Sequence, residues 1–207
     1  MEPERHDLSD RIRMDLLFRL RWNILGSLDD VKIATGPHDQ TALVPLFGCP
    51  LAEESLGQPP ISLIDKVWMT DCMSKRDFDY AEEEYRYNPP APLTITNQDG
   101  SPITLGQFVT RVHVYLNENM EELKKVKGEL YGREVTREDG STGRDIIDGQ
   151  PYLPPDIAFF FKRVDAGSVG EEVWISVSVW AEGEMGRSND WFWSMQLRQA
   201  HLHEQKR

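Results

Sequence analysis

The feature that most constrains the fold is a helical pattern of apolar residues after Thr104. Thr104 and Gln107 have the spacing of a capping box, in which side chains hydrogen-bond the free backbone N–H groups of a first helical turn. The apolar positions on one face of the next six or so turns are Leu105, Phe108, Val109, Val112, Leu116, Met120 and Leu123. Glu121 and Glu122 precede Lys124 and Lys125 on it, and Gly128 ends the pattern. The sequence therefore predicts one long central helix with a packing face.

The C-terminal third has a different period. Residues 157–164 form an apolar run, and residues 173–181 alternate between aliphatic side chains and tryptophan or serine. Large apolar side chains alternate again over residues 191–197, with tryptophan at positions 191 and 193. Glycine-containing loops separate the three segments, so we expect a three-stranded antiparallel meander.

The remaining segments carry weaker patterns. Apolar residues at a spacing of four predict an N-terminal helix over residues 7–25. Residues 61–72 fit a short helix slightly better than a strand, and residues 75–87 fit either a connecting loop or a solvated helix. Short strands are expected at 31–34, 42–47 and 93–96, with irregular segments at about 27–60 and 128–156.

These elements together predict an α+β fold. The expected antiparallel sheet consists of the C-terminal meander plus the short earlier strands, packed against the long central helix and the N-terminal helix. Neither an internal repeat nor a boundary between two cores is visible, so we expect residues 1–207 to form a single domain.

The net charge of the chain limits which kinds of molecule it is expected to bind. The 207 residues carry 35 acidic and 23 basic side chains, for a formal net charge of −12. This charge repels phosphate backbones and anionic lipid headgroups, so we expect neither nucleic acid nor a membrane surface as partner. No apolar run approaches the ~20 residues of a membrane span. Two cysteines and no secretion signal favour a soluble, intracellular protein, and we expect it in the cytoplasm.

The sequence contains no strong catalytic or cofactor motif. Neither Cys49 nor Cys72 has a neighbour that would activate its thiol, and no phosphate loop or nucleophile elbow is present. The glycine-rich segment 139–145 is expected to be a flexible turn. We therefore expect no cofactor.

The histidines and carboxylates offer few candidates. His113 is expected at the edge of the core, bonded to a carbonyl. His201 and His203 could share a metal ion only with further ligands, so no metal site is predicted. Any carboxylate buried in a cavity could act as a general acid or base. Those near apolar elements are Asp65, Asp71, Asp148, Asp156 and Asp165.

Tryptophan is the most informative residue type. Trp174 and Trp180 fall on one face of a predicted strand with two serines between them, and Trp191 and Trp193 share a face of the next. Such indoles commonly form core, here beneath the long helix. They can equally bind a partner peptide or an apolar small molecule.

The segments 102–105, 108–109, 112–113 and 115–116, with Lys162-Arg163-Val164-Asp165 further on, resemble a fungal family of domains of unknown function. In that family a short strand leads into a helix that begins with an Ile-Thr-Val type of sequence, and an Arg-Val-Asp segment precedes a tryptophan-containing strand. The resemblance implies a related fold and assigns no catalytic residue.

Two functional hypotheses follow. The first is a non-catalytic protein-interaction module that binds its partner through the tryptophan-bearing sheet or the acidic stretch 79–84. The alternative is a small cofactor-free enzyme, of the cyclase or isomerase type, that acts on an apolar small molecule in a tryptophan-lined pocket.

Overall fold

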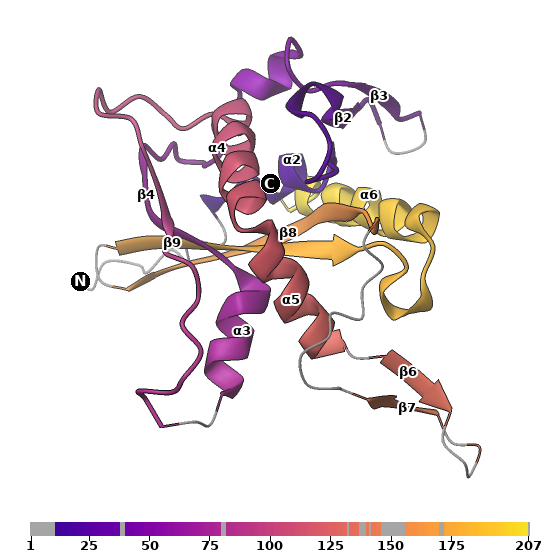
Figure 1. Cartoon of the computed structure of the whole chain (residues 1–207). Helices are drawn as coiled ribbons and strands as arrows, with labels where there is room; N and C mark the ends of the chain where they lie inside the picture. Colours follow the sequence, from indigo (N-terminus) through magenta and orange to yellow (C-terminus); the bar gives the residue numbers. More distant parts are fainter. Residues whose placement is uncertain are drawn as a thin grey trace.

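The computed structural model describes residues 11–37, 40–79, 82–131, 133–136, 140, 142–145, 156–169 and 172–206. Within them the chain has an α+β fold, as predicted, around a four-stranded sheet in the order β5-β4-β9-β8 (Figure 1). The strands are β4 (Leu63–Met69), β5 (Leu93–Thr96), β8 (Phe159–Val169) and β9 (Glu172–Ala181). Strand β4 runs antiparallel to β5 but parallel to β9, so the purely antiparallel sheet predicted from the sequence is wrong at this pair.

The β8–β9 hairpin confirms two strands of the predicted meander. Its register runs from Phe159 opposite Ala181 to Val169 opposite Glu172, with a bulge between Phe161 and Arg163. A bulge adds one residue to one strand and changes which side chains share a face.

The predicted third strand over 191–197 is wrong. These residues belong to helix α6 (Asn189–Glu204), which Ser188 caps by accepting a hydrogen bond from the Trp191 N–H at 3.2 Å. The residues that α6 buries include Phe192, Gln196 and Ala200, at a helical spacing of four. The tryptophans of this segment alternate with a period of two, but its buried residues follow the helical spacing.

The predicted N-terminal helix is also wrong over the described residues 11–25, and residues 7–10 lie outside the described part. A single turn, α2 (Met14–Leu17), is followed by strand β1 (Leu20–Arg21). Beyond it the Ile24 N–H donates to the Phe159 carbonyl at 2.7 Å, and the Phe161 N–H donates to the Trp22 carbonyl at 3.0 Å. Leu20, Trp22 and Ile24 are all buried, and this spacing of two along the edge of β8 replaces the helical spacing.

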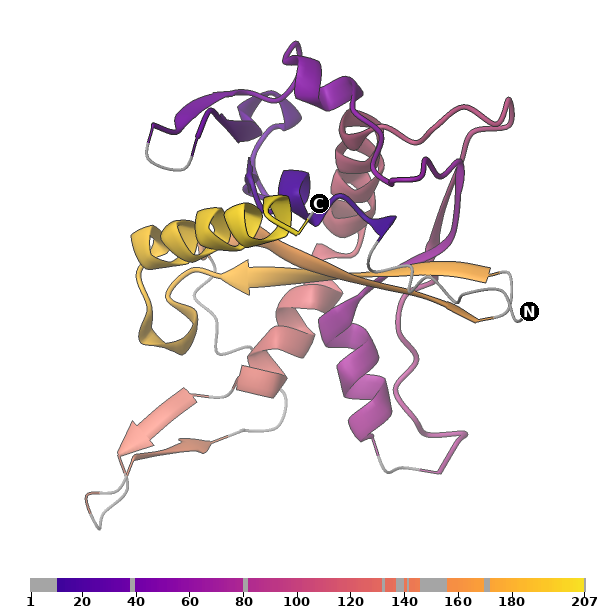
Figure 2. The same ribbon diagram turned by 180° about the vertical axis from the view of Figure 1, so that it is seen from behind.

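A small second sheet has the order β1-β2-β3, with β2 at Lys32–Thr35 and β3 at Ala42–Pro45. These two strands confirm the predictions at 31–34 and 42–47. Two short 3-10 helices also lie within the segment predicted to be irregular, η1 (Leu28–Asp30) and η2 (Pro50–Glu53). In Figure 2 the small sheet and α6 lie near the same end of the β8–β9 hairpin, and α6 packs against α2.

The long central helix forms in two parts, α4 (Leu105–Glu118) and α5 (Met120–Tyr131), which meet at Asn119. Its predicted start is confirmed, because the Thr104 hydroxyl accepts the Gln107 N–H at 3.2 Å. The predicted Glu–Lys spacing yields one ion pair, Lys124–Glu121, at 3.5 Å. In Figure 1, α4 lies above the β8–β9 hairpin, and α5 continues below it beside α3 (Thr70–Phe78).

The prediction of a helix over 61–72 is wrong for most of that segment. It forms strand β4, and α3 begins only at Thr70. The bulge between Ile64 and Val67 explains the misleading pattern. Both side chains are buried although they are three residues apart, which is a helical spacing in a sequence.

Other segments add little to the site. Strand β5 confirms the prediction at 93–96, and the segment 128–156, predicted to be irregular, contains the end of α5 and the hairpin β6 (Arg133–Thr136) with β7 (Thr142–Asp145). One continuous core cluster extends from Ile12 to Ala181. Across the described ranges, no helix has the length and apolarity that crossing a membrane requires.

Candidate functional site

The tryptophans of β9 point away from α4. The alternate residues Ile175, Val177 and Val179 belong to the core cluster that contains Val109 and Val112 of α4. Trp174 and Trp180 therefore occupy the opposite side of the sheet, which we call the outer face. The prediction that the long helix packs on these indoles is wrong, because the all-aliphatic side of β9 supplies an apolar surface without buried hydroxyls.

The first aromatic group on the outer face joins β9 to α6. The ring of Trp180 stacks on Phe192, with centroids 4.9 Å apart and planes 11° apart. Trp191 lies 6.1 Å from Trp180, and Trp193 lies 5.3 Å from Phe160. Trp180 and Trp193 are buried, whereas Trp191 remains 42% exposed. Of these three predicted binding residues, Trp191 alone presents a large exposed ring.

The second aromatic group lies at the other end of β9, where partly exposed Trp174 pairs with partly exposed Trp68 at 6.4 Å. Trp174 lies over Gly167, its register partner on β8. A Cβ atom on Gly167 would be 2.5 Å from Trp174 Cζ2, so the ring occupies space that only glycine leaves open. Trp68 is not among the predicted binding residues, because the apolar pattern of its segment predicts a helix.

A short hydroxyl chain separates the two aromatic groups. Ser178 donates a hydrogen bond to the Thr70 oxygen at 2.9 Å, and the Thr70 and Ser176 hydroxyls are 2.6 Å apart. The three hydroxyl groups carry three protons, and two of these are used in the hydrogen bonds between them. One proton therefore remains for a further acceptor, whether Thr70 or Ser176 is the donor in their shared bond.

Beside this chain the outer face contains a recess of about 340 Å³. Its lining residues are Thr70, Asp71, Ser74, Lys162, Arg163, Ser178 and Val179. Thr70 and Asp71 begin α3, and the bulge in β8 lets the consecutive residues Lys162 and Arg163 both border the recess. The lining is polar and contains no tryptophan, unlike the apolar pocket expected for the enzyme hypothesis.

Two buried charged residues, Lys127 and Glu184, lie next to Asp71. Lys127 of α5 is 1% exposed, and its Nζ lies 2.9 Å from Glu184 Oε2 and 3.5 Å from Asp71 Oδ1. Glu184 Oε2 also accepts the Ala181 N–H at 2.9 Å. Burial raises the pKa of Asp71 above its ordinary value, although the Lys127 ammonium opposes that shift. Among the described carboxyls of the predicted set, Asp71 alone both lines a recess and has a raised pKa.

The other predicted carboxylates have different surroundings. Asp65 accepts the Val173 N–H at 2.7 Å, which ties β4 to β9. Asp165 pairs with Arg163 at 3.5 Å, and Asp156 is exposed. Asp148 and part of the glycine-rich segment 139–145 lie outside the described residues.

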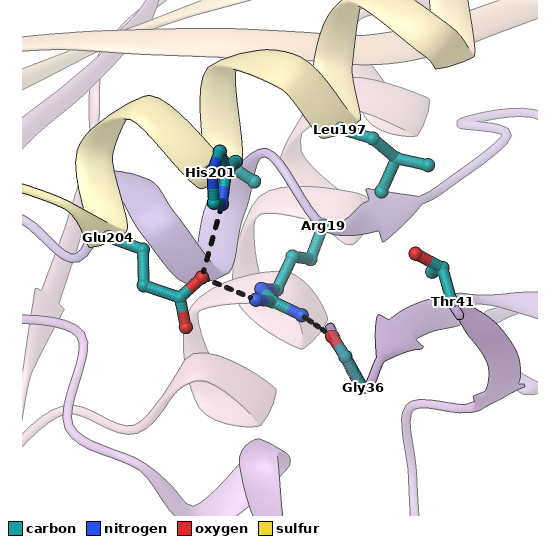
Figure 3. A pocket seen from close by; sticks show the side chains of 7 residues that line it. Arg19, Gly36, Thr41, Leu197, His201 and Glu204 are labelled. Carbon is teal, nitrogen blue, oxygen red and sulfur yellow. Dashed lines mark hydrogen bonds and ion pairs between the residues drawn. The ribbon is translucent and has the colours of Figure 1, made fainter. Parts of the chain in front are cut away.

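The histidines serve packing and pairing. His113 Nδ1 accepts the Trp22 indole N–H at 3.1 Å, rather than bonding to a carbonyl as predicted. The rings of His203 and Phe18 stack at 5.5 Å. His201 borders a pocket of about 10 Å³, too small for a ligand, in which Arg19 bridges Glu204 and the Gly36 carbonyl (Figure 3).

The remaining candidate nucleophiles and ligands do not assemble into a site. Burial raises the pKa of Cys72 to about 11, which keeps its thiol protonated at neutral pH. Within the described ranges, no three histidine, cysteine or carboxylate side chains cluster closely enough to hold a metal ion. No known protein family, curated protein or solved structure matches the chain.

Proposed function

We propose that this protein is an intracellular interaction module without catalytic activity, which binds a partner protein along the outer face of its sheet. The observation that carries the proposal is the arrangement of that face. The partly exposed pair of Trp68 and Trp174 and the exposed Trp191 lie at its two ends, on either side of the polar recess. Exposed indoles beside a recess are the kind of anchor on which protein interfaces depend.

The charges of the outer face support an acidic partner segment. Basic side chains lie over its indoles, with Lys66 5.7 Å from the Trp68 ring and Arg187 5.2 Å from the Trp191 ring. Lys162 and Arg163 lie between these ends. On a chain with a net charge of −12, such a basic and aromatic surface would attract acidic segments that the rest of the molecule repels.

The test compares Trp174→Ala and Trp191→Ala with Tyr85→Ala, whose ring is 74% exposed in the segment between α3 and β5. Partners are captured from lysate by cross-linking, and each one identified is then titrated against the purified variants. The two tryptophan variants should weaken binding by about 2 kcal/mol, roughly 30-fold, while Tyr85→Ala should not. Equal affinities for all three variants, with unchanged circular dichroism, would contradict the proposal.

One observation favours the enzyme as a second candidate. Asp71 combines a raised pKa with a position in a recess large enough for a small molecule, which suits a general acid or base. The polar lining would select a polar substrate. Wild-type protein incubated with a metabolite extract should then convert a compound that Asp71→Asn leaves intact, with Asp156→Asn as the active control. Identical metabolite profiles for the wild type and Asp71→Asn would exclude this candidate.

A further inference from the structure

We propose that the recess on the outer face binds a phosphate monoester carried by a side chain of the partner, an inference that rests on the proposed role of this face in partner binding. The recess joins two cationic side chains, hydroxyl donors and the start of a helix at one place. Each of these groups favours a multiply charged oxyanion over a neutral ligand.

The two cations that border the recess have donors to spare. Arg163 Nε lies 3.5 Å from Asp165 Oδ2, and the Arg163 side chain is 52% exposed. Because the guanidinium group is planar, the terminal nitrogens of Arg163 point in fixed directions and can form the paired hydrogen bonds that suit phosphate. Lys162 Nζ lies 3.8 Å from Glu184 Oε1, longer than a hydrogen bond, so its ammonium keeps donors for a ligand.

The carboxylates near the recess are already compensated. Glu184 Oε2 accepts hydrogen bonds from Lys127 Nζ and the Ala181 N–H, both at 2.9 Å. Asp71 Oδ1 also faces Lys127 Nζ at 3.5 Å, so the buried ammonium offsets part of its charge, and burial raises the pKa of Asp71 above its ordinary value. The positive charges of Lys162 and Arg163 are therefore not cancelled at the recess by these two acidic groups.

Neutral donors complete the set. The hydroxyl chain of Ser176, Thr70 and Ser178 has one proton beyond its two internal bonds. When Ser176 donates to Thr70, this proton is on Thr70, which lines the recess. Helix α3 begins at Thr70, and the side chain of its N-cap residue, Met69, makes no capping hydrogen bond. The first-turn N–H groups of a helix favour an anionic acceptor. These groups add to the two cations and would have little effect alone.

The size of the recess favours an ester over the free anion. Its volume of about 340 Å³ falls within the range of small-molecule sites and is ample for a phosphorylated side chain with part of its backbone. The indoles at either end of the outer face would then contact the flanking residues of the partner. A free phosphate or a small phosphate ester offers the same chemistry to the recess, so the experiment must separate these sources.

The experiment titrates the full-length protein by NMR and calorimetry with three probes: inorganic phosphate, phosphoserine, and a phosphoserine peptide with its unphosphorylated form. The variants are Lys162→Ala and Arg163→Ala, with Lys32→Ala as the control, because Lys32 is an exposed lysine of β2 in the small sheet and does not line the recess. The phosphopeptide should bind more tightly than phosphoserine or inorganic phosphate. Either recess variant should weaken phosphopeptide binding about tenfold or more, and Lys32→Ala should change it much less.

The inference would be overturned by no binding of any phosphate probe, by equal binding of the unphosphorylated peptide, or by undiminished binding by a folded Arg163→Ala variant. Tighter binding of inorganic phosphate than of the phosphopeptide would assign the recess to a free anion and would also overturn it. Partner binding that still depends on Trp174 in any of these cases would show that the proposed function stands while this inference fails. If the phosphopeptide binds the recess and neither Trp174→Ala nor Trp191→Ala changes that binding, the phosphate inference stands while the proposed function fails.

Discussion

At the scale of single residues, His113 illustrates how tertiary contacts define a side chain's role. Its Nδ1 accepts the Trp22 indole N–H, which requires a neutral ring with its proton on Nε2. Burial lowers the pKa of His113 below its ordinary value of 6.5. Protonation would cost both the desolvation of a charged ring and the hydrogen bond from Trp22.

This environment predicts a pH dependence of stability. The unfolded chain takes up a proton on His113 near pH 6.5 and the folded chain only at lower pH, so the free energy of unfolding falls as the pH drops through that window. Urea unfolding of the wild type and His113→Gln between pH 7.5 and pH 5, measured by fluorescence, checks this expectation. The wild type should lose more stability on acidification than the variant, and parallel losses would contradict the assignment.

At the scale of elements, α6 depends on a cap that its sequence pattern conceals. Ser188 accepts the Trp191 N–H, and this bond begins the helix that places Phe192 and Trp193 against Trp180 and Phe160. The buried residues of α6 include Phe192, Gln196 and Ala200, which are four residues apart as in a helix. The alternation of the tryptophans does not correspond to a strand.

Ser188→Ala should therefore destabilise the protein by about 1 kcal/mol, because a first-turn N–H loses its partner. Ser188→Asp retains a capping oxygen and serves as the control, with stability close to the wild type. Urea unfolding monitored by circular dichroism compares the three proteins. A cost for Ser188→Asp as large as that for Ser188→Ala would argue against the cap.

At the scale of the whole molecule, Lys127 connects parts of the chain that are far apart in sequence. Strand β4 ends opposite Val177, so the last residues of β9 lie beyond it, and α5 brings Lys127 to this end of the sheet. There it meets Asp71 of α3 and Glu184 after β9, all three buried. The ammonium holds these elements together beside Asp71, which lines the recess.

Lys127→Met should cost about 3–5 kcal/mol of stability, because it leaves buried carboxylates without their counterion. Lys124→Met on the same helix removes only a partly exposed ion pair with Glu121 and should change stability by less than about 1 kcal/mol. Urea unfolding at neutral pH compares the two variants. Similar losses for both would show that the buried ammonium contributes no more than a surface charge.

The sequence alone predicted the features that depend on local chemistry. It predicted the cap at Thr104, the strands at 93–96 and over most of β8 and β9, and the common face of Trp174 and Trp180. Capping and strand alternation act over a few residues, so they are visible without knowledge of the fold.

Only the tertiary structure decided which faces are covered and which residues meet. Bulges at Ile64–Val67 and Phe161–Arg163 changed the side-chain period, and the pairing of residues 22–24 with β8 replaced a predicted helix by an extended edge. The recess joins Thr70, Arg163 and Ser178 across a strand register that no local pattern encodes. The physical reason is that burial and pairing are long-range properties, and they override periodicity wherever a segment fits two patterns.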